Sequence, residues 1–164
     1  MVCYKYNDYV KLVREYLRNY NRWHIAVQNM QEEIEAKQRE IAVIAAPVAK
    51  YGNTTGGVNE LTSVEREASM HEQARQDISS LERGLATLRR KLAQLERAIH
   101  GLQPEEQELL RRRYIDGGSW LAISGVMHVS PDWARKRARR ALGHVAGMIF
   151  GSVAEQQALF TFVS

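Results

Sequence analysis

The strongest constraint on the fold is a run of eight aliphatic residues whose spacing alternates between three and four positions. They are Ile78, Leu81, Leu85, Leu88, Leu92, Leu95, Ile99 and Leu102. This spacing places every member on one side of an α-helix, as in a coiled coil. A continuous aliphatic seam of this length is unfavourable in water. We therefore expect a long helix here that packs against a helical partner.

A second long helix is predicted over residues 4–45, where helix breakers are almost absent. Residues 46–61 then interrupt the pattern with a proline and several glycines, which predicts a long loop. Thr62 to Glu65 form a capping box that starts the next helix. Two helices of similar length joined by one loop predict an antiparallel hairpin over residues 1–101. An apolar residue recurs at every seventh position of the first helix: Tyr6, Val13, Tyr20, Val27, Ile34 and Ile41.

The partner of the aliphatic seam has three alternatives: the first helix, a second copy of the chain, or both. We expect both, so the hairpin is predicted to form a homo-oligomer through residues 78–102. The other reading is that the first helix alone buries the seam.

Residues 102–151 predict a separate all-helical domain, with residues 152–164 as a tail beyond it. Pro104 suits the first turn of a helix, because its missing N–H would have no partner there. Asp116-Gly117-Gly118 ends that helix, and Ser119 is an N-cap for the next. The predicted fold class is therefore all-α: a helical hairpin followed by a three-helix domain of the helix-turn-helix type.

The second and third helices of this domain are joined by a very short connection. Four apolar residues of the second helix are expected to pack against both neighbouring helices: Leu121, Ile123, Val126 and Met127. His128 lies in the connection, where a left-handed residue is expected and histidine is tolerated. Ser130 caps the last helix. That helix is expected to bury one seam: Ala134, Ala138, Ala141, Leu142 and Val145.

The positive charge of the chain is concentrated in this last helix. Residues 130–150 carry five basic side chains and one acidic side chain. The net charge of this segment is therefore +4, which equals the net charge of the whole chain. Positive charge confined to one helix is typical of nucleic-acid binding. An α-helix also fits the major groove of DNA. We therefore expect double-stranded DNA, a promoter or an operator, as the partner.

The positions opposite the buried seam are the predicted DNA contacts. Arg135 and Lys136, near the start of the helix, are assigned to base edges, with Asp132 or Trp133 shaping which bases are read. The remaining predicted DNA-binding residues, mainly phosphate contacts, are Arg137, Arg139, Arg140, Arg112, Arg113 and Ser119.

Each assignment has a plainer alternative. The basic run can be an ordinary solvated face, and Trp133 can be a core residue. Residues 111–113 can pair with the glutamates one turn earlier.

The domain resembles region 4 of bacterial sigma factors, which reads a promoter element. The matching pieces are Leu102-x-Pro104-Glu105, Arg113-Tyr114, Gly117-x-Ser119-Trp120, Ile123, Val129-Ser130 and Ala141-Leu142. Residues 4–151 also resemble phage transcriptional regulators of the RinA and ArpU type. That similarity includes the loop and the start of the second helix: Lys50-Tyr51-Gly52, Gly56-Gly57 and Ser63-x-Glu65.

The resemblance implies a sequence-specific regulator of phage late genes. It would act as a sigma-like or activator protein in the cytoplasm of a bacterial host, with host RNA polymerase as a further partner. Two residues depart from the pattern. Gly125 lies inside a helix, and Arg137 stands where sigma-like domains keep an apolar residue.

Other classes of function have little support in the sequence. The histidines and the single cysteine, Cys3, show no metal-ligand spacing, and no catalytic constellation is recognisable. We expect no enzyme activity, no cofactor and no metal. No apolar run is long enough to span a membrane, and no signal peptide is expected.

Two other functions remain as alternatives. One is the small terminase subunit of a phage, which also joins a helix-turn-helix to oligomerising helices. The other is an interaction module whose hairpin binds a protein and whose basic helix is incidental.

Overall fold

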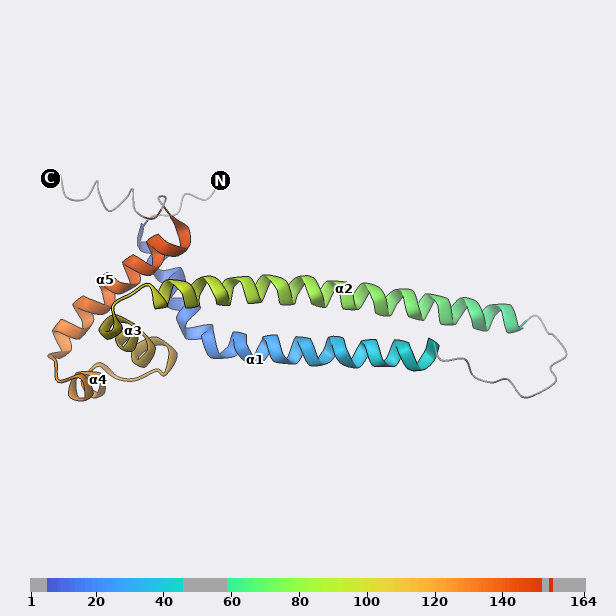
Figure 1. Ribbon diagram of the computed structural model, residues 1–164, viewed down its shortest axis with the longest axis horizontal. Coiled ribbons are helices and arrows are strands. Elements are labelled where there is room, and N and C mark those ends of the chain that lie inside the picture. The colour runs from blue at the N-terminus through green and yellow to red at the C-terminus, as the bar shows by residue number, and fades with distance from the viewer. Residues whose placement is uncertain (1–5, 46–58, 152–153, 155–164) are drawn as a thin grey trace. The chain divides into compact units, whose positions relative to one another are not determined.

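The computed structural model describes residues 6–45, 59–151 and 154 of the chain (Figure 1). Over these residues the fold is built from α-helices with no strand, so the predicted all-α class is confirmed. None of the described helices is both long and apolar enough to cross a membrane. The helices are α1 Tyr6–Ala45, α2 Asn59–His100, α3 Pro104–Leu110, α4 Trp120–Met127 and α5 Pro131–Phe150.

The described residues form two compact units whose boundaries fall within the two long helices. The core unit consists of the described residues of Met1–His24 and Arg90–Ser164, and the paired-helix unit of those of Ile25–Arg89. This division differs from the predicted domains, residues 1–101 and 102–151. The first turns of α1 and the last turns of α2 belong with α3, α4 and α5.

The predicted loop and tail fall largely outside the described residues. Of the loop, residues 46–58 are not described, and its last three residues are helical because α2 begins at Asn59. The capping box predicted at Thr62 is therefore wrong, since Thr62 lies inside the helix. Of the tail, only Ala154 is described, and it is buried in the core unit.

The core unit is organised around the small, fully buried face of α5. Ala134, Ala138 and Ala141 expose no surface, as the sequence predicted. Small side chains allow α3 and α4 to approach α5 closely. Two further elements pack into the same core. Their fully buried residues are Val13 and Leu17 of α1 and Leu95 of α2.

The connection between α3 and α4 differs from the single helical end that was predicted. After Leu110 the chain widens into a π-helical turn over Arg111–Ile115, in which the Asp116 N–H donates to the Arg111 carbonyl over 3.0 Å. The Gly118 N–H then donates to the Arg112 carbonyl over 2.8 Å. A Cβ at Gly118 would lie 2.9 Å from that carbonyl oxygen, so this close approach requires glycine.

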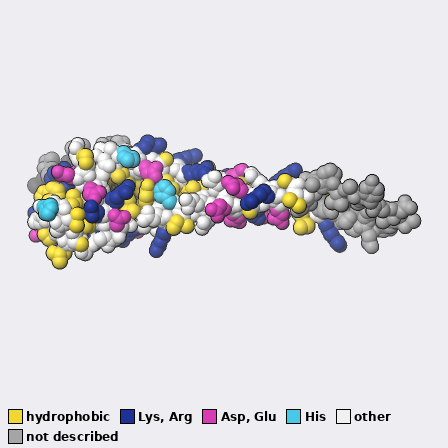
Figure 2. Space-filling view, turned by 60° about the horizontal axis from the view of Figure 1, so that its bottom comes forward, with side chains coloured by type: hydrophobic (Ala, Val, Ile, Leu, Met, Phe, Trp, Pro, Cys, Tyr) yellow, Lys and Arg dark blue, Asp and Glu magenta, His cyan; other side chains and the backbone are white. Residues whose placement is uncertain are grey.

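The connection between α4 and α5 has the predicted left-handed residue. His128 has φ 54° and ψ 40°, and its N–H donates to the Ser124 carbonyl at the end of α4. The prediction for α4 itself is wrong in part. Leu121 and Val126 are 77% and 56% exposed, because no described element covers that side of the helix. Figure 2 shows hydrophobic side chains reaching the surface at this end of the core unit.

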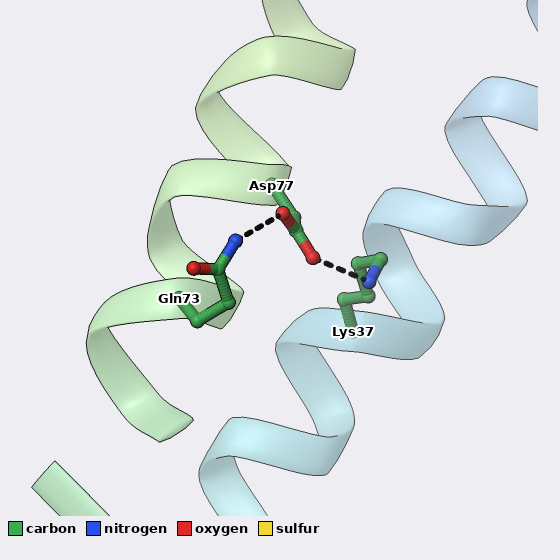
Figure 3. Close-up of polar contacts among 3 residues, drawn as sticks. All are labelled: Lys37, Gln73 and Asp77. Atoms are coloured by element: carbon green, nitrogen blue, oxygen red, sulfur yellow. Dashed lines mark hydrogen bonds and ion pairs between the residues drawn. The ribbon is translucent and has the colours of Figure 1, made fainter. Parts of the chain in front are cut away.

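In the paired-helix unit, α1 and α2 are linked by polar contacts between residues far apart in the sequence. Lys37 Nζ of α1 lies 3.2 Å from Asp77 Oδ2 of α2 (Figure 3). Within α2, Gln73 Nε2 donates to the other oxygen of this carboxylate, Asp77 Oδ1, over 3.0 Å. The hydrogen bond from Gln73, followed by that from Lys37, lowers the pKa of Asp77 below its usual value. Acidic and basic side chains are interspersed over this unit in Figure 2, as on an ordinary solvated surface.

The aliphatic seam on α2 is covered within the chain. Leu85, Leu92, Leu95 and Leu102 are buried, and the other four members are half-buried. This is the alternative in which one chain satisfies its own seam. Homo-oligomerisation through residues 78–102 therefore stays a prediction that the burial of these residues does not require.

The fold predicts opposite effects of alanine at two glycines. A Cβ at Gly125, inside α4, would meet no atom within 4 Å. Gly125→Ala is expected to stabilise the protein by about 1 kcal/mol, because glycine loses more backbone entropy than alanine on forming a helix. Gly118→Ala, the matched control, is expected to destabilise it. Urea unfolding measures both, and a Gly125→Ala variant no more stable than the parent would contradict the placement of α4.

Candidate nucleic-acid interface

The start of α5 is held by local interactions that the sequence encodes. Ser130 has extended backbone angles, and its hydroxyl accepts a hydrogen bond from the Trp133 N–H over 3.2 Å. Pro131 occupies the first turn, where a missing N–H has no consequence. Asp132 follows near the positive end of the helix dipole. The first turn of α5 is thus a capped and largely exposed helix end.

The six residues predicted to face away from the alanine seam are all exposed. Trp133, for which a core position was the alternative, is 38% exposed. One side of α5 therefore carries small, buried side chains, and the opposite side carries exposed side chains that are predominantly cationic. The six exposed residues are Asp132, Trp133, Arg135, Lys136, Arg139 and Arg140.

Three of these cations have no hydrogen bond or ion pair among the described residues: Lys136, Arg139 and Arg140. The fourth, Arg135, has Nη1 2.8 Å from Asp132 Oδ1, and both side chains are mainly exposed. Exposed ion pairs of this kind contribute little free energy, about 0–1 kcal/mol. Arg135 can therefore exchange Asp132 for an external acceptor at little cost.

Arg137, predicted to hold a phosphate, pairs instead with a buried carboxylate of the chain. Its Nε is 2.9 Å from Oε1 of Glu106, a residue of α3 that is only 3% exposed. The N–H of that nitrogen is not aligned with the carboxylate, so the contact is an ion pair without a well-formed hydrogen bond. A buried carboxylate needs a compensating cation. Arg137 supplies it, which explains a charge where an apolar residue was expected.

Two other predicted phosphate contacts are also engaged within the chain. Arg112 Nε donates to Glu108 Oε1 over 2.6 Å, which is the predicted alternative of pairing one turn apart. Arg113 donates to the Gly118 carbonyl over 2.6 Å and stacks over the Trp120 ring, 4.7 Å from its centre. Both arginines thus stabilise the chain between α3 and α4.

Ser119 is exposed and caps α4. Its hydroxyl oxygen accepts a hydrogen bond from the Ala122 N–H over 3.1 Å. The hydroxyl proton remains available to an external acceptor, so the cap is compatible with the predicted contact to DNA.

Two basic residues that were not predicted as DNA contacts lie beside this surface. Lys11 and Arg14 of α1 line an open groove of about 420 Å³ together with Arg135 and Arg139 of α5. The only signal in the sequence was their spacing of three on a helix. Nothing in that spacing indicated that α1 would lie next to α5.

A second hollow in the core unit, of about 280 Å³, has a different character. Glu96 and Glu108 line it together with Arg111, so its charges are of both signs. The Tyr20 hydroxyl donates to Glu96 over 3.0 Å, and burial, followed by this hydrogen bond, raises the pKa of Tyr20. The mixed charge makes this hollow a poor site for a polyanion.

Comparison with known proteins yields no match to a protein-family model, a curated protein or a solved structure. Within residues 6–45, 59–151 and 154 there is also no group of three metal-ligating side chains.

The ion pair between α3 and α5 predicts that Arg137 matters for stability. Arg137→Ala leaves Glu106 buried without its cation, so we expect a loss of about 3 kcal/mol, the low end for a broken buried pair. Combining it with Glu106→Leu should recover most of the loss. Lys136→Ala, on the neighbouring exposed position, should change stability by less than about 0.5 kcal/mol. Equal effects of Arg137→Ala and Lys136→Ala in urea unfolding would refute a structural role for the pair.

Proposed function

We propose that this protein is a sequence-specific, double-stranded DNA-binding transcriptional regulator whose α5 enters the major groove. The observation that carries the proposal is the division of α5 into a fully buried alanine face and an exposed cationic face. A helix whose opposite side is buried presents its charges in a fixed orientation relative to the rest of the domain, as a DNA-reading helix must.

The distribution of partners on α5 supports this proposal. A cation whose role is structural is expected to be paired within the chain, as Arg137 is. Lys136, Arg139 and Arg140 have no such partner among the described residues. Cations without internal partners on one face attract a polyanion. Phosphates are the source of most of the affinity in protein–DNA complexes.

The position of each residue along α5 assigns its role. Residues in the first turns of a recognition helix meet base edges, and later ones meet the backbone. Arg135 and Lys136 are therefore the proposed base contacts, with the carboxylate of Asp132 orienting the Arg135 guanidinium. Arg139 and Arg140 are the proposed phosphate contacts.

The resemblance to sigma factor region 4 and to RinA- and ArpU-type regulators makes a phage promoter the favoured target. The capped Ser130-Pro131 start and the left-handed His128 supply the short, sharply turned connection that such a domain needs. Contact with host RNA polymerase and regulation of late genes belong to the proposal through this resemblance alone.

The proposal predicts that substitution of a base contact reduces sequence discrimination, whereas substitution of a phosphate contact reduces affinity for every sequence. Lys136→Gln or Arg135→Gln should reduce discrimination at one or two base pairs by about 1–3 kcal/mol. Arg140→Gln should weaken binding to all sequences alike and lower the salt dependence by about one phosphate contact. The measurement is competition binding of duplexes with single substitutions, starting from a duplex selected from a random pool.

Arg39→Gln is the matched control, because Arg39 is an exposed arginine of α1 in the paired-helix unit. It removes the same charge and should leave the sequence preference unchanged. If both base-contact variants keep the parental preference, α5 is not the reading helix. If the parent selects no sequence from the pool, the proposed function fails altogether.

A further inference from the structure

The groove between α1 and α5 gathers four cationic side chains without an acidic one among its lining residues. Lys11 and Arg14 come from α1, and Arg135 and Arg139 from α5. The rest of the lining is apolar or aromatic: Val10, Tyr114 and Trp120. All seven residues belong to the core unit, so the groove is formed within one compact body.

The cations of the groove are weakly engaged within the chain. Lys11 Nζ lies 3.5 Å from Asp8 Oδ1, and Arg135 pairs with Asp132, both at the solvent-exposed surface. Arg14 stands 5.9 Å over the Tyr114 ring, and its Nε is buried without a hydrogen-bond partner among the described residues. Four cations that line one groove, with only exposed ion pairs to carboxylates beside it, make the local potential positive. The groove is therefore arranged for a negatively charged ligand.

We propose that this groove binds the phosphate backbone of the DNA duplex that α5 reads, so that Lys11 and Arg14 of α1 are phosphate contacts. This inference rests on the proposed function and extends the DNA interface to a helix outside the three-helix domain. It assigns to the first turns of α1 a binding role in addition to their place in the core.

Two features favour a duplex backbone over a small free anion. The groove is open and, at about 420 Å³, is far larger than one phosphate group. It also shares Arg135 and Arg139 with the exposed face of α5. A helix in the major groove has the sugar–phosphate strands along its flanks. A cationic groove on the flank of α5 therefore lies where a strand of the same duplex would pass.

The test compares paired substitutions that remove equal charge. Lys11→Gln/Arg14→Gln removes two cations from the groove, and Arg39→Gln/Arg75→Gln removes two exposed ones from the paired-helix unit. The probes are a fluorescent 20-base-pair duplex of random sequence and a duplex selected by the parent protein. Their affinities are measured across about 50–200 mM salt, where the slope of log affinity against log salt counts phosphate contacts.

The groove variant should lower that slope by about two phosphate contacts on both probes while keeping the parental base preference. The control pair should leave the slope unchanged. Lys11→Arg/Arg14→Lys keeps both charges and should keep the slope, which separates loss of charge from damage to the core around the half-buried Arg14.

If the groove variant has the same slope of log affinity against log salt as the parent protein, the inference is overturned, even when Arg135→Gln and Lys136→Gln lose specificity as expected. That combination leaves the proposed function intact. A reduced slope in the charge-keeping variant also overturns it, because the effect would then come from altered packing. If the parent binds neither probe, the inference falls together with the proposed function.

Discussion

The close packing of the alanine face of α5 is the interaction on which the rest of the core unit depends. Ala134, Ala138 and Ala141 are fully buried, and a larger side chain at any of them would force α5 away from its neighbours. Because these three positions set the rotation of α5 about its axis, they also set which residues point outward. The cationic surface is thus a consequence of packing on the opposite side of the same helix.

The features that were predictable from the sequence are those encoded by neighbouring residues. Helix caps act over three or four positions, and the N-caps at Ser119 and Ser130 are observed where they were expected. The left-handed conformation of His128 is likewise a local consequence of a short turn. The alternation of buried and exposed positions on α5 follows from the helical period alone.

The features that were missed depend on which helices meet. Val13 belongs to the row of apolar residues at every seventh position, and Leu17 lies four positions later on the same side of α1. Such spacing is equally compatible with a coiled coil and with packing onto a three-helix domain. Periodicity identifies the apolar face of a helix and leaves its partner open. The same holds for charge: Arg137 and Glu106 belong to different helices, so no spacing rule could pair them. Leu121 shows the converse case, an apolar residue for which no described element provides a partner.

The packing of α1 onto the core unit also bears on how a single chain would bind DNA under the proposed function. One recognition helix reads few base pairs, so additional affinity must come from a second reader or from more phosphate contacts. A second reader would need a second copy of the chain, and the homo-oligomer expected through residues 78–102 would supply one. The burial of that seam within one chain does not require such a copy. The cations of α1 offer the other route. With Lys11 and Arg14 beside α5, one chain would present charge from two helices to the proposed duplex without a second copy.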